Sequence, residues 1–155
     1  MNYIKLDESN AAFLTKIFSN PEYELYFAEN KTSGEEWKER LACFVGKESY
    51  IVHKGTSPVG WVMYQVEGTT CNVDIIVLLD EERHKGYGQE ILHDMIERNK
   101  GLKTIKLDVQ ERNIGARRFY EKMGFRVVGM EQQPIGESVT DYYKLQLDID
   151  GGKCP

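Results

Sequence analysis

The segment that most limits the fold of this chain runs from residue 75 to residue 109. It opens with five consecutive apolar residues, Ile75–Leu79, which is the pattern of a strand covered on both faces. Apolar residues then recur at helical spacing over Tyr87–Arg98, and Thr104–Val109 alternates apolar with polar side chains. A strand, a helix and a strand in this order predict a crossover connection, and hence a parallel pair of strands at the centre of a sheet.

Shorter patterns on either side predict the rest of the sheet and its helices. Alternating stretches between turn residues predict strands, and apolar residues at helical spacing after a capping residue predict helices. The expected strands cover residues 3–6, 50–53, 59–66, 71–79, 125–128 and 142–147, and the expected helices begin after Asp7, after Thr32 and at Asn113. The fold class is therefore α/β (α+β), a mixed, mostly antiparallel sheet with a central parallel pair and helices on both faces. Residues 1–150 are expected to form a single domain, with 151–155 as a flexible tail.

Composition limits the partners of this chain. Its 155 residues carry a net charge of -5, which argues against binding nucleic acid by neutralising phosphates. No apolar run is long enough to cross a membrane and the N-terminus does not resemble a signal peptide, so a cytoplasmic protein is expected. Three cysteines without CxxC spacing predict neither a disulfide framework nor a metal site, and Cys43 and Cys71 are expected to pack as small apolar side chains.

The segment Arg83–Gln89 carries the strongest chemical signal, because it lies between the apolar strand and the amphipathic helix. The first N–H groups of a helix have no partner within the helix, so a loop in this place can bind an anion. Gly86 and Gly88 let the backbone approach a phosphate, and Arg83 and Lys85 add positive charge. The pattern lacks the endings of a Walker loop and of a dinucleotide fingerprint. Taken alone, it fits a pyrophosphate site and a structural turn equally well.

Two stretches together resemble the GNAT superfamily of acyl-CoA-dependent N-acyltransferases. Residues 73–89 resemble its motif A, in which a strand is followed by the pattern Q/RxxGxG/A and a long helix. Residues 108–125 are similar to its motif B. Both lie in the family's order and at its separation, and the N-terminal helices and hairpin fit its layout. The resemblance therefore covers nearly the whole chain.

The resemblance implies where acetyl-CoA would bind. Its pyrophosphate would lie on the glycine-containing loop, and its pantetheine arm would run along the preceding strand like an added strand. Asn113 would bond the pantetheine arm, although its position also fits a helix N-cap. The implied loop residues are Arg83, His84, Lys85, Gly86, Tyr87, Gly88 and Gln89, and the implied strand residues are Ile76, Val77 and Leu78.

Candidates for proton transfer follow from the same resemblance. It implies that Tyr120 stands near the thioester sulfur and protonates the departing thiolate, whereas the residues alone also fit a core aromatic. Many family members place a glutamate base on the strand, but the matching position here is Asn72. Asp74 shares that strand face and is the candidate base; a carboxylate paired with a lysine or arginine is the alternative. His53 and His84 are weaker candidates.

The resemblance also implies that the segment from Pro21 to Trp37 recognises the acceptor. Its acids and aromatics suit a cationic amine, and they equally fit a solvated face over core aromatics. The residues in question are Glu22, Tyr23, Glu24, Tyr26, Phe27 and Glu29.

The expected reaction is direct transfer of the acetyl group of acetyl-CoA to a primary amine of a small molecule in a ternary complex. No metal is required for it. A protein or peptide N-acetyltransferase and a non-catalytic acyl-CoA sensor are the alternatives. Dimers are common in the family, so a homodimer is left open.

Overall fold

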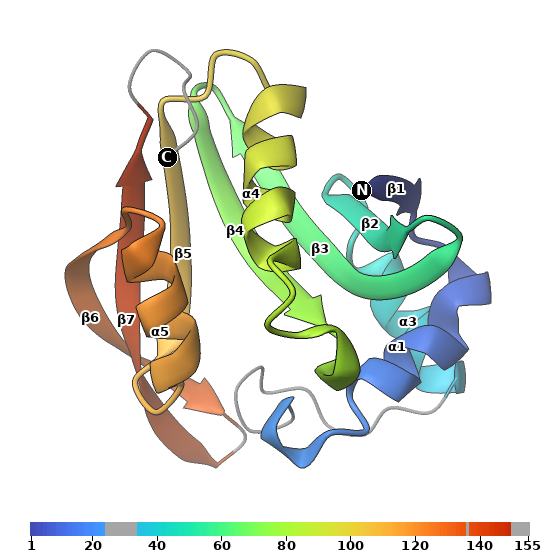
Figure 1. Ribbon diagram of the computed structural model, residues 1–155. Coiled ribbons are helices and arrows are strands. Elements are labelled where there is room, and N and C mark those ends of the chain that lie inside the picture. Colours follow the sequence, from blue (N-terminus) through green and yellow to red (C-terminus); the bar gives the residue numbers. More distant parts are fainter. Residues whose placement is uncertain (24–33, 136, 150–155) are drawn as a thin grey trace. The chain divides into compact units, whose positions relative to one another are not determined.

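The computed structural model describes residues 1–23, 34–135 and 137–149 (Figure 1). Within these residues the chain forms two compact units, and each is described by itself. The first unit contains residues 1–65 and 75–91, and the second contains residues 66–74 and the chain from residue 92 onward. Strand β4 (Thr70–Leu78) and helix α4 (Tyr87–Arg98) each begin in one unit and end in the other.

Seven strands form one mixed sheet in the order β1-β2-β3-β4-β5-β7-β6. β4 and β5 are parallel, with Thr70 opposite Thr104 and Asn72 opposite Lys106. The ladders β1–β2, β2–β3, β5–β7 and β6–β7 are antiparallel. The predicted fold class, with a parallel pair inside a mostly antiparallel sheet, is confirmed. The remaining strands are β1 (Asn2–Lys5), β2 (Glu48–Lys54), β3 (Ser57–Glu67), β5 (Thr104–Gln110), β6 (Arg126–Ile135) and β7 (Ser138–Asp148).

The first unit contains the helices α1 (Ala11–Ile17) and α3 (Gly34–Ala42). A 3₁₀ turn at Glu8–Asn10 leads into α1, and the Asp7 side chain caps this turn by accepting from the Ser9 N–H group. The helix start predicted after Asp7 is therefore confirmed. The start predicted for the second helix, around Thr32 and Ser33, lies outside the described residues.

Aromatic side chains form the core of the first unit. Phe18, Trp37 and Trp61 are all buried, and their ring centroids lie 5.8, 6.0 and 6.1 Å apart. The Trp61 indole N–H donates to Ser49 Oγ at 3.0 Å, so this buried polar atom has a partner. Strand residues such as Ile75 belong to the same cluster, which packs α1 and α3 against one face of the sheet.

Strands β2 and β3 of the first unit are covered on both faces. Ile51 and Val52 are 1% and 0% exposed, and Trp61 and Val62 are each 1% exposed. Successive residues of a strand point to opposite faces, so burial of both neighbours requires cover on both sides.

The second unit packs α5 (Ile114–Lys122) beside β5 and β7 (Figure 1). The Arg117 guanidinium lies 4.2 Å from the ring centre of Tyr143 on β7. Apolar side chains on alternate strand positions form the core beneath the helix, as the period-2 pattern predicted. They include Ile105, Leu107, Val109, Leu145 and Leu147.

Strands β6 and β7 are longer than the predicted 125–128 and 142–147. Their ladder runs from Arg126 opposite Gln146 to Ile135 opposite Ser138. The polar residues and Pro134 in this stretch have the composition of a loop. However, β6 is the last strand of the sheet, where polar side chains meet solvent and a proline need not donate to a ladder.

The cysteine prediction is correct for one residue and wrong for another. Cys71 is buried, with its Sγ 3.6 Å from Met95 Sδ, whereas Cys43 is exposed. Cys43 follows the last residue of α3, outside the face that carries Trp37 into the core.

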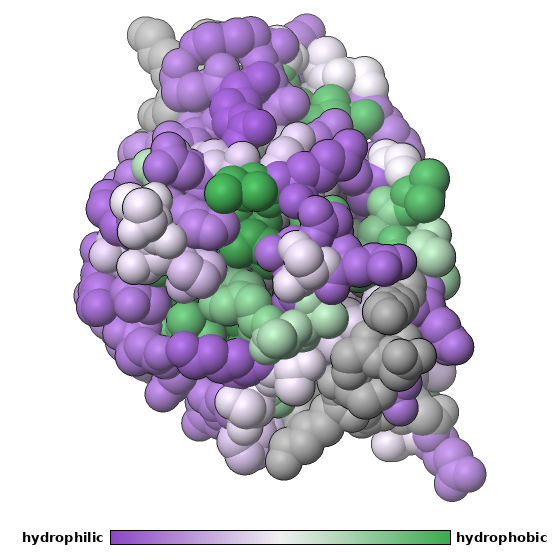
Figure 2. Space-filling view, turned by 90° about the vertical axis from the view of Figure 1, so that its right-hand side faces the viewer, coloured by the Kyte–Doolittle hydropathy of each residue, from purple (hydrophilic) through white to green (hydrophobic). Residues whose placement is uncertain are grey.

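The surface of the first unit is largely polar but includes exposed apolar side chains. Ile4 on the edge strand β1 is 54% exposed, and Val45 beyond α3 is 86% exposed. Figure 2 shows apolar residues gathered among polar ones on one face of the molecule. No helix in the described part of the chain has the length and hydropathy needed to span a membrane.

Candidate functional site

The loop between β4 and α4 has an unusual backbone. A 3₁₀ turn (Asp80–Glu82) leads to His84, with a φ of 62°, and to Gly86, with a φ of 84°. Helix α4 begins at Tyr87, and the Glu90 N–H donates to the Gly86 carbonyl at 3.2 Å. The N–H groups that precede Glu90 therefore have no partner within the helix. Together with the helix dipole they form a place for an anion.

Both positive side chains of this loop are paired with carboxylates. Arg83 Nη1 lies 3.6 Å from Asp80 Oδ1 and 3.9 Å from Glu22 Oε2. Lys85 Nζ lies 3.0 Å from Glu82 Oε2, and this hydrogen bond holds the pKa of Lys85 above its usual value. The charge expected to attract a phosphate is thus already compensated. The backbone N–H groups are the stronger anion-binding feature of the loop.

Strand β4 has one open face. Asn72 and Asp74 are exposed, and Ile76 and Leu78 are half-buried on the same face. Val77, which points the other way, is 3% exposed. The expectation that this strand is covered on both faces is therefore wrong for one face. The register with β5 ends at Asn72, while β4 itself continues to Leu78.

Tyr23 joins the segment that follows α1 to the end of β4. Its hydroxyl donates to the Leu78 carbonyl at 2.7 Å, and the Arg83 guanidinium lies 5.8 Å from its ring centre. Burial raises the pKa of Tyr23, although Arg83 acts against this rise, so the hydroxyl is a proton donor at neutral pH. Asn20 Nδ2 also donates to Asp80 Oδ1 at 3.2 Å. The sequence predicts neither the contact of Tyr23 with the end of β4 nor its contact with Arg83.

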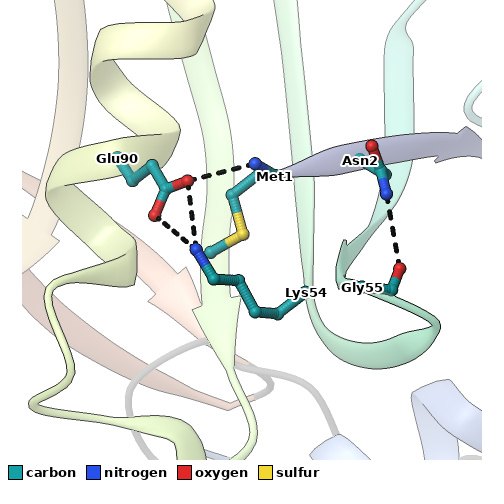
Figure 3. A network of polar contacts seen from close by, with 5 residues as sticks. All are labelled: Met1, Asn2, Lys54, Gly55 and Glu90. Atoms are coloured by element: carbon teal, nitrogen blue, oxygen red, sulfur yellow. Dashed lines mark hydrogen bonds and ion pairs between the residues drawn. The ribbon is translucent and has the colours of Figure 1, made fainter.

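A carboxylate in the first turn of α4 joins three segments (Figure 3). Glu90 accepts from the Met1 amino group at 3.0 Å and from Lys54 Nζ at 3.3 Å. The contact with the amino group is the main reason that the pKa of Glu90 lies below its usual value. Lys54 Nζ also lies 5.5 Å from the ring centre of Tyr87. The network holds the turn between β2 and β3 against the start of α4.

Asn113 and Tyr120 lie in the second unit. Asn113 Oδ1 accepts from the Ala116 N–H at 3.2 Å, so the N-cap interpretation is confirmed. Tyr120 is 8% exposed, and its ring centre lies 5.1 Å from that of Phe119 and 5.3 Å from that of Phe125. Burial raises the pKa of Tyr120, which keeps its hydroxyl protonated at neutral pH. A protonated hydroxyl is what a general acid requires.

Gln110, the last residue of β5, is a buried polar residue that the sequence analysis missed. It is 1% exposed, and its Nε2 donates to the Tyr142 hydroxyl at 3.2 Å. Its Oε1 is buried without a hydrogen-bond partner. An unpaired buried carbonyl oxygen costs free energy, so binding of a hydrogen-bond donor at Gln110 Oε1 would be favourable. The sequence contains one signal for it: Gln110 directly follows the alternation of apolar and polar residues over 104–109 and lies three residues before Asn113.

The two candidate histidines lie on β2 and in the loop after β4. His53 Nδ1 lies 3.3 Å from the carbonyl of Ile51 on its own strand, and His84 is an exposed loop residue. Among the residues that the structure describes, no group of three or more His, Cys, Asp and Glu side chains has the arrangement of a metal site. Glu24, Tyr26, Phe27 and Glu29 of the acceptor segment lie outside the described residues.

Within the first unit, the structure brings together Glu22, Tyr23, the end of β4 and the loop over residues 79–89. A comparison with protein families then decides the assignment, because the acetyltransferase (GNAT) family matches residues 10–125. The chain belongs to the GNAT acetyltransferase family. It is accordingly an acetyl-CoA-dependent N-acetyltransferase, as the two sequence motifs predicted. Among curated protein sequences, none matches it significantly.

Solved structures share the fold of this GNAT acetyltransferase at low sequence identity. A spermidine N-acetyltransferase from Vibrio cholerae, solved with CoA and spermine, is 18% identical with a TM-score of 0.78, covering 95% of this chain and 94% of that one. The aminoglycoside acetyltransferase AAC(6′)-Ib, solved with coenzyme A, is 15% identical with a TM-score of 0.76 and covers 95% and 94%. A ribosomal-protein-alanine N-acetyltransferase from Brucella melitensis is 17% identical with a TM-score of 0.71 and covers 96% and 100%. These names include both small-molecule and protein acceptors.

Proposed function

We propose that this acetyltransferase transfers the acetyl group of acetyl-CoA to a primary amine of a small, cationic molecule. The observation that carries the proposal is the acidic character of the first unit beside the anion-binding loop. Glu22, Asp80 and Glu81 are exposed carboxylates on the segment after α1 and on the turn after β4, and Glu82 on the same turn is half-buried. Such a surface attracts ammonium groups from solution. Two relatives of the same fold act, by their names, on the polyamine spermidine and on aminoglycosides.

For the cofactor, the first unit offers two features that fit. The N–H groups of residues 86–89 suit a pyrophosphate, and the space above Gly86 is open, because a Cβ added there would meet no atom within 4 Å. The main-chain groups of Ile76, Val77 and Leu78 suit an extended amide-containing arm. His84, Lys85 and Tyr87 complete the proposed loop contacts, and Asn113 is proposed, by the family resemblance, to bond the pantetheine arm.

For the chemistry, we assign proton transfer to two residues. Bound acetyl-CoA supplies a thioester whose carbonyl carbon is attacked by the neutral amine. Tyr120 gives its proton to the sulfur as the carbon–sulfur bond breaks, and its hydroxyl, whose pKa is raised by burial, carries this proton at neutral pH. Asp74, exposed on the open face of β4, accepts the proton that the amine loses, directly or through water. Main-chain N–H groups of β4 polarise the carbonyl.

A thiol-release screen tests the proposed acceptor class. Purified protein and acetyl-CoA are incubated with spermidine, spermine, an aminoglycoside, free amino acids and a peptide with an N-terminal alanine, and free CoA thiol is measured. We expect release with a polyamine or an aminoglycoside. Release with the peptide alone would assign a protein acceptor. Binding of acetyl-CoA without release for any amine would instead support the non-catalytic sensor.

A further inference from the structure

Arg83 occupies a position between two parts of the proposed site. Its guanidinium faces Glu22 and Asp80 and lies against the ring of Tyr23. Glu22 and Tyr23 belong to the segment after α1, which the family resemblance assigns to the acceptor, whereas Arg83 begins the loop assigned to the pyrophosphate. Arg83 is therefore a direct link between the two, and all the residues involved lie in the first unit.

Other contacts hold the same two segments together without Arg83. Tyr23 donates to the Leu78 carbonyl at 2.7 Å, and Asn20 donates to Asp80 at 3.2 Å. From α1 itself, Lys16 Nζ lies 3.5 Å from Glu81 Oε1. The segment after α1 consequently has attachments to the loop that do not depend on where the Arg83 guanidinium points.

The ion pairs of Arg83 are of the kind that a phosphate can displace. Their N···O distances, 3.6 and 3.9 Å, are longer than the 2.7–2.9 Å of a charge-assisted hydrogen bond. The Arg83 side chain is 34% exposed and that of Glu22 is 61% exposed, so solvent screens their attraction. A phosphate offers the guanidinium a bidentate partner, which is the geometry that arginine binds most strongly.

We infer that Arg83 exchanges partners when the cofactor binds, leaving Glu22 for the pyrophosphate. This inference rests on the proposed function and extends it to a coupling between cofactor binding and acceptor binding. Without cofactor, Arg83 neutralises Glu22. With cofactor, the Glu22 carboxylate is released and becomes a partner for a cationic amine. Acetyl-CoA and a cationic acceptor then favour each other's binding, because the two effects are reciprocal.

Calorimetric titration of acetyl-CoA into three proteins tests the exchange without turnover. Glu22→Gln removes the competitor, so its acetyl-CoA affinity should rise about two- to five-fold, the equivalent of one exposed ion pair. Glu81→Gln is the matched control. It also deletes one exposed negative charge, but Glu81 contacts Lys16 instead of Arg83. The control should bind within about 1.5-fold of the wild type at physiological salt.

Two further titrations separate the exchange from general electrostatics. In an Arg83→Gln background, adding Glu22→Gln should leave acetyl-CoA affinity unchanged. Acetyl-pantetheine, which lacks the pyrophosphate, should bind the wild type and Glu22→Gln equally. Equal gains for Glu22→Gln and Glu81→Gln, or a Glu22→Gln gain that persists without Arg83, would overturn the inference. Wild-type binding of acetyl-CoA in the same experiment would still leave the proposed function standing.

Discussion

The Tyr23 hydroxyl donates to the Leu78 main-chain carbonyl at 2.7 Å, across 55 residues of sequence. The other end of the same peptide group is also held, because the Leu79 N–H donates to the Val59 carbonyl at 2.8 Å. The end of β4, from which the cofactor loop departs, is thereby fixed on two sides. Its position depends on a residue of the segment proposed to recognise the acceptor.

Tyr23→Phe should lower the free energy of unfolding by about 1 kcal/mol, because it deletes one partly buried hydrogen bond and leaves the Leu78 carbonyl without this donor. It should also weaken acetyl-CoA binding. Urea unfolding and calorimetric titration measure the two effects. Tyr50→Phe, the same change at an exposed hydroxyl, is the control and should shift stability by less than about 0.5 kcal/mol. Equal losses of stability and of acetyl-CoA affinity in the two variants would show that the hydrogen bond from Tyr23 to Leu78 does not fix the end of β4.

Gly86→Ala should weaken acetyl-CoA binding in addition to lowering the free energy of unfolding. An added methyl group meets no neighbour, but the φ of 84° is unfavourable for alanine by about 1–2 kcal/mol. Gly46→Ala is matched, with a φ of 89° and equally open surroundings. Both variants should lose similar stability in urea, and only Gly86→Ala should lose acetyl-CoA affinity. Unchanged affinity in Gly86→Ala would contradict the phosphate assignment of the loop.

Tyr120→Phe should reduce kcat by about 10²- to 10⁴-fold while leaving acetyl-CoA affinity nearly unchanged, because only the general acid is removed. Tyr143→Phe, on β7 against Arg117, controls for loss of a tyrosine hydroxyl in the same unit. The measurement is steady-state thiol release with whichever amine the screen identifies. Turnover of Tyr120→Phe that matches the wild type across pH would exclude Tyr120 as the proton donor.

The free energy of unfolding should fall in alkaline solution, because the buried Cys71 thiol ionises more readily in the unfolded chain than in the folded one. Burial raises the pKa of Cys71 from 9.0 to about 12. The thiol therefore stays neutral in the folded protein while it ionises in the unfolded chain. Its contribution to the free energy of unfolding is complete below pH 9 and is lost as the pH rises toward 12. Tyr120 adds a similar loss above pH 10, since its pKa is also raised by burial.

Urea unfolding between pH 7 and 10.5 measures this loss. Cys71→Ala should flatten the decline by up to about 1 kcal/mol per pH unit above pH 9, whereas Cys43→Ala, at an exposed position, should not. In addition, the Cys71 thiol should resist modification by a thiol reagent in the folded protein. An unchanged pH profile in Cys71→Ala would show that another group causes the decline.

Strong local signals made much of the fold predictable. Helix α4 was predicted at its observed bounds, because its apolar period is regular and a Gly101 turn follows it. Asn113 was predicted as an N-cap for a similar reason. The lengths of β6 and β7 were not predictable, since polar residues form an edge strand only through the partner that they pair with.

The candidate site was predictable in its residue types but not in its contacts. The glycines and charges of the loop are visible in sequence, whereas the compensation of Arg83 by Glu22 depends on two distant segments meeting. The unpaired Oε1 of Gln110 likewise follows from burial, which no local pattern reports at the end of a strand. Whether a charged side chain such as Arg83 is available to a ligand therefore depends on the tertiary contacts that pair it with another residue.

We propose above all that the loop over residues 83–89 binds the pyrophosphate of acetyl-CoA. Calorimetric titration of the wild-type protein with acetyl-CoA and, in parallel, with acetyl-pantetheine tests it most directly. We expect one acetyl-CoA per chain and an affinity for acetyl-pantetheine that is lower by about tenfold or more, because acetyl-pantetheine lacks the charge-assisted contacts of the pyrophosphate. Equal affinities, or no acetyl-CoA binding at millimolar concentration, would contradict it.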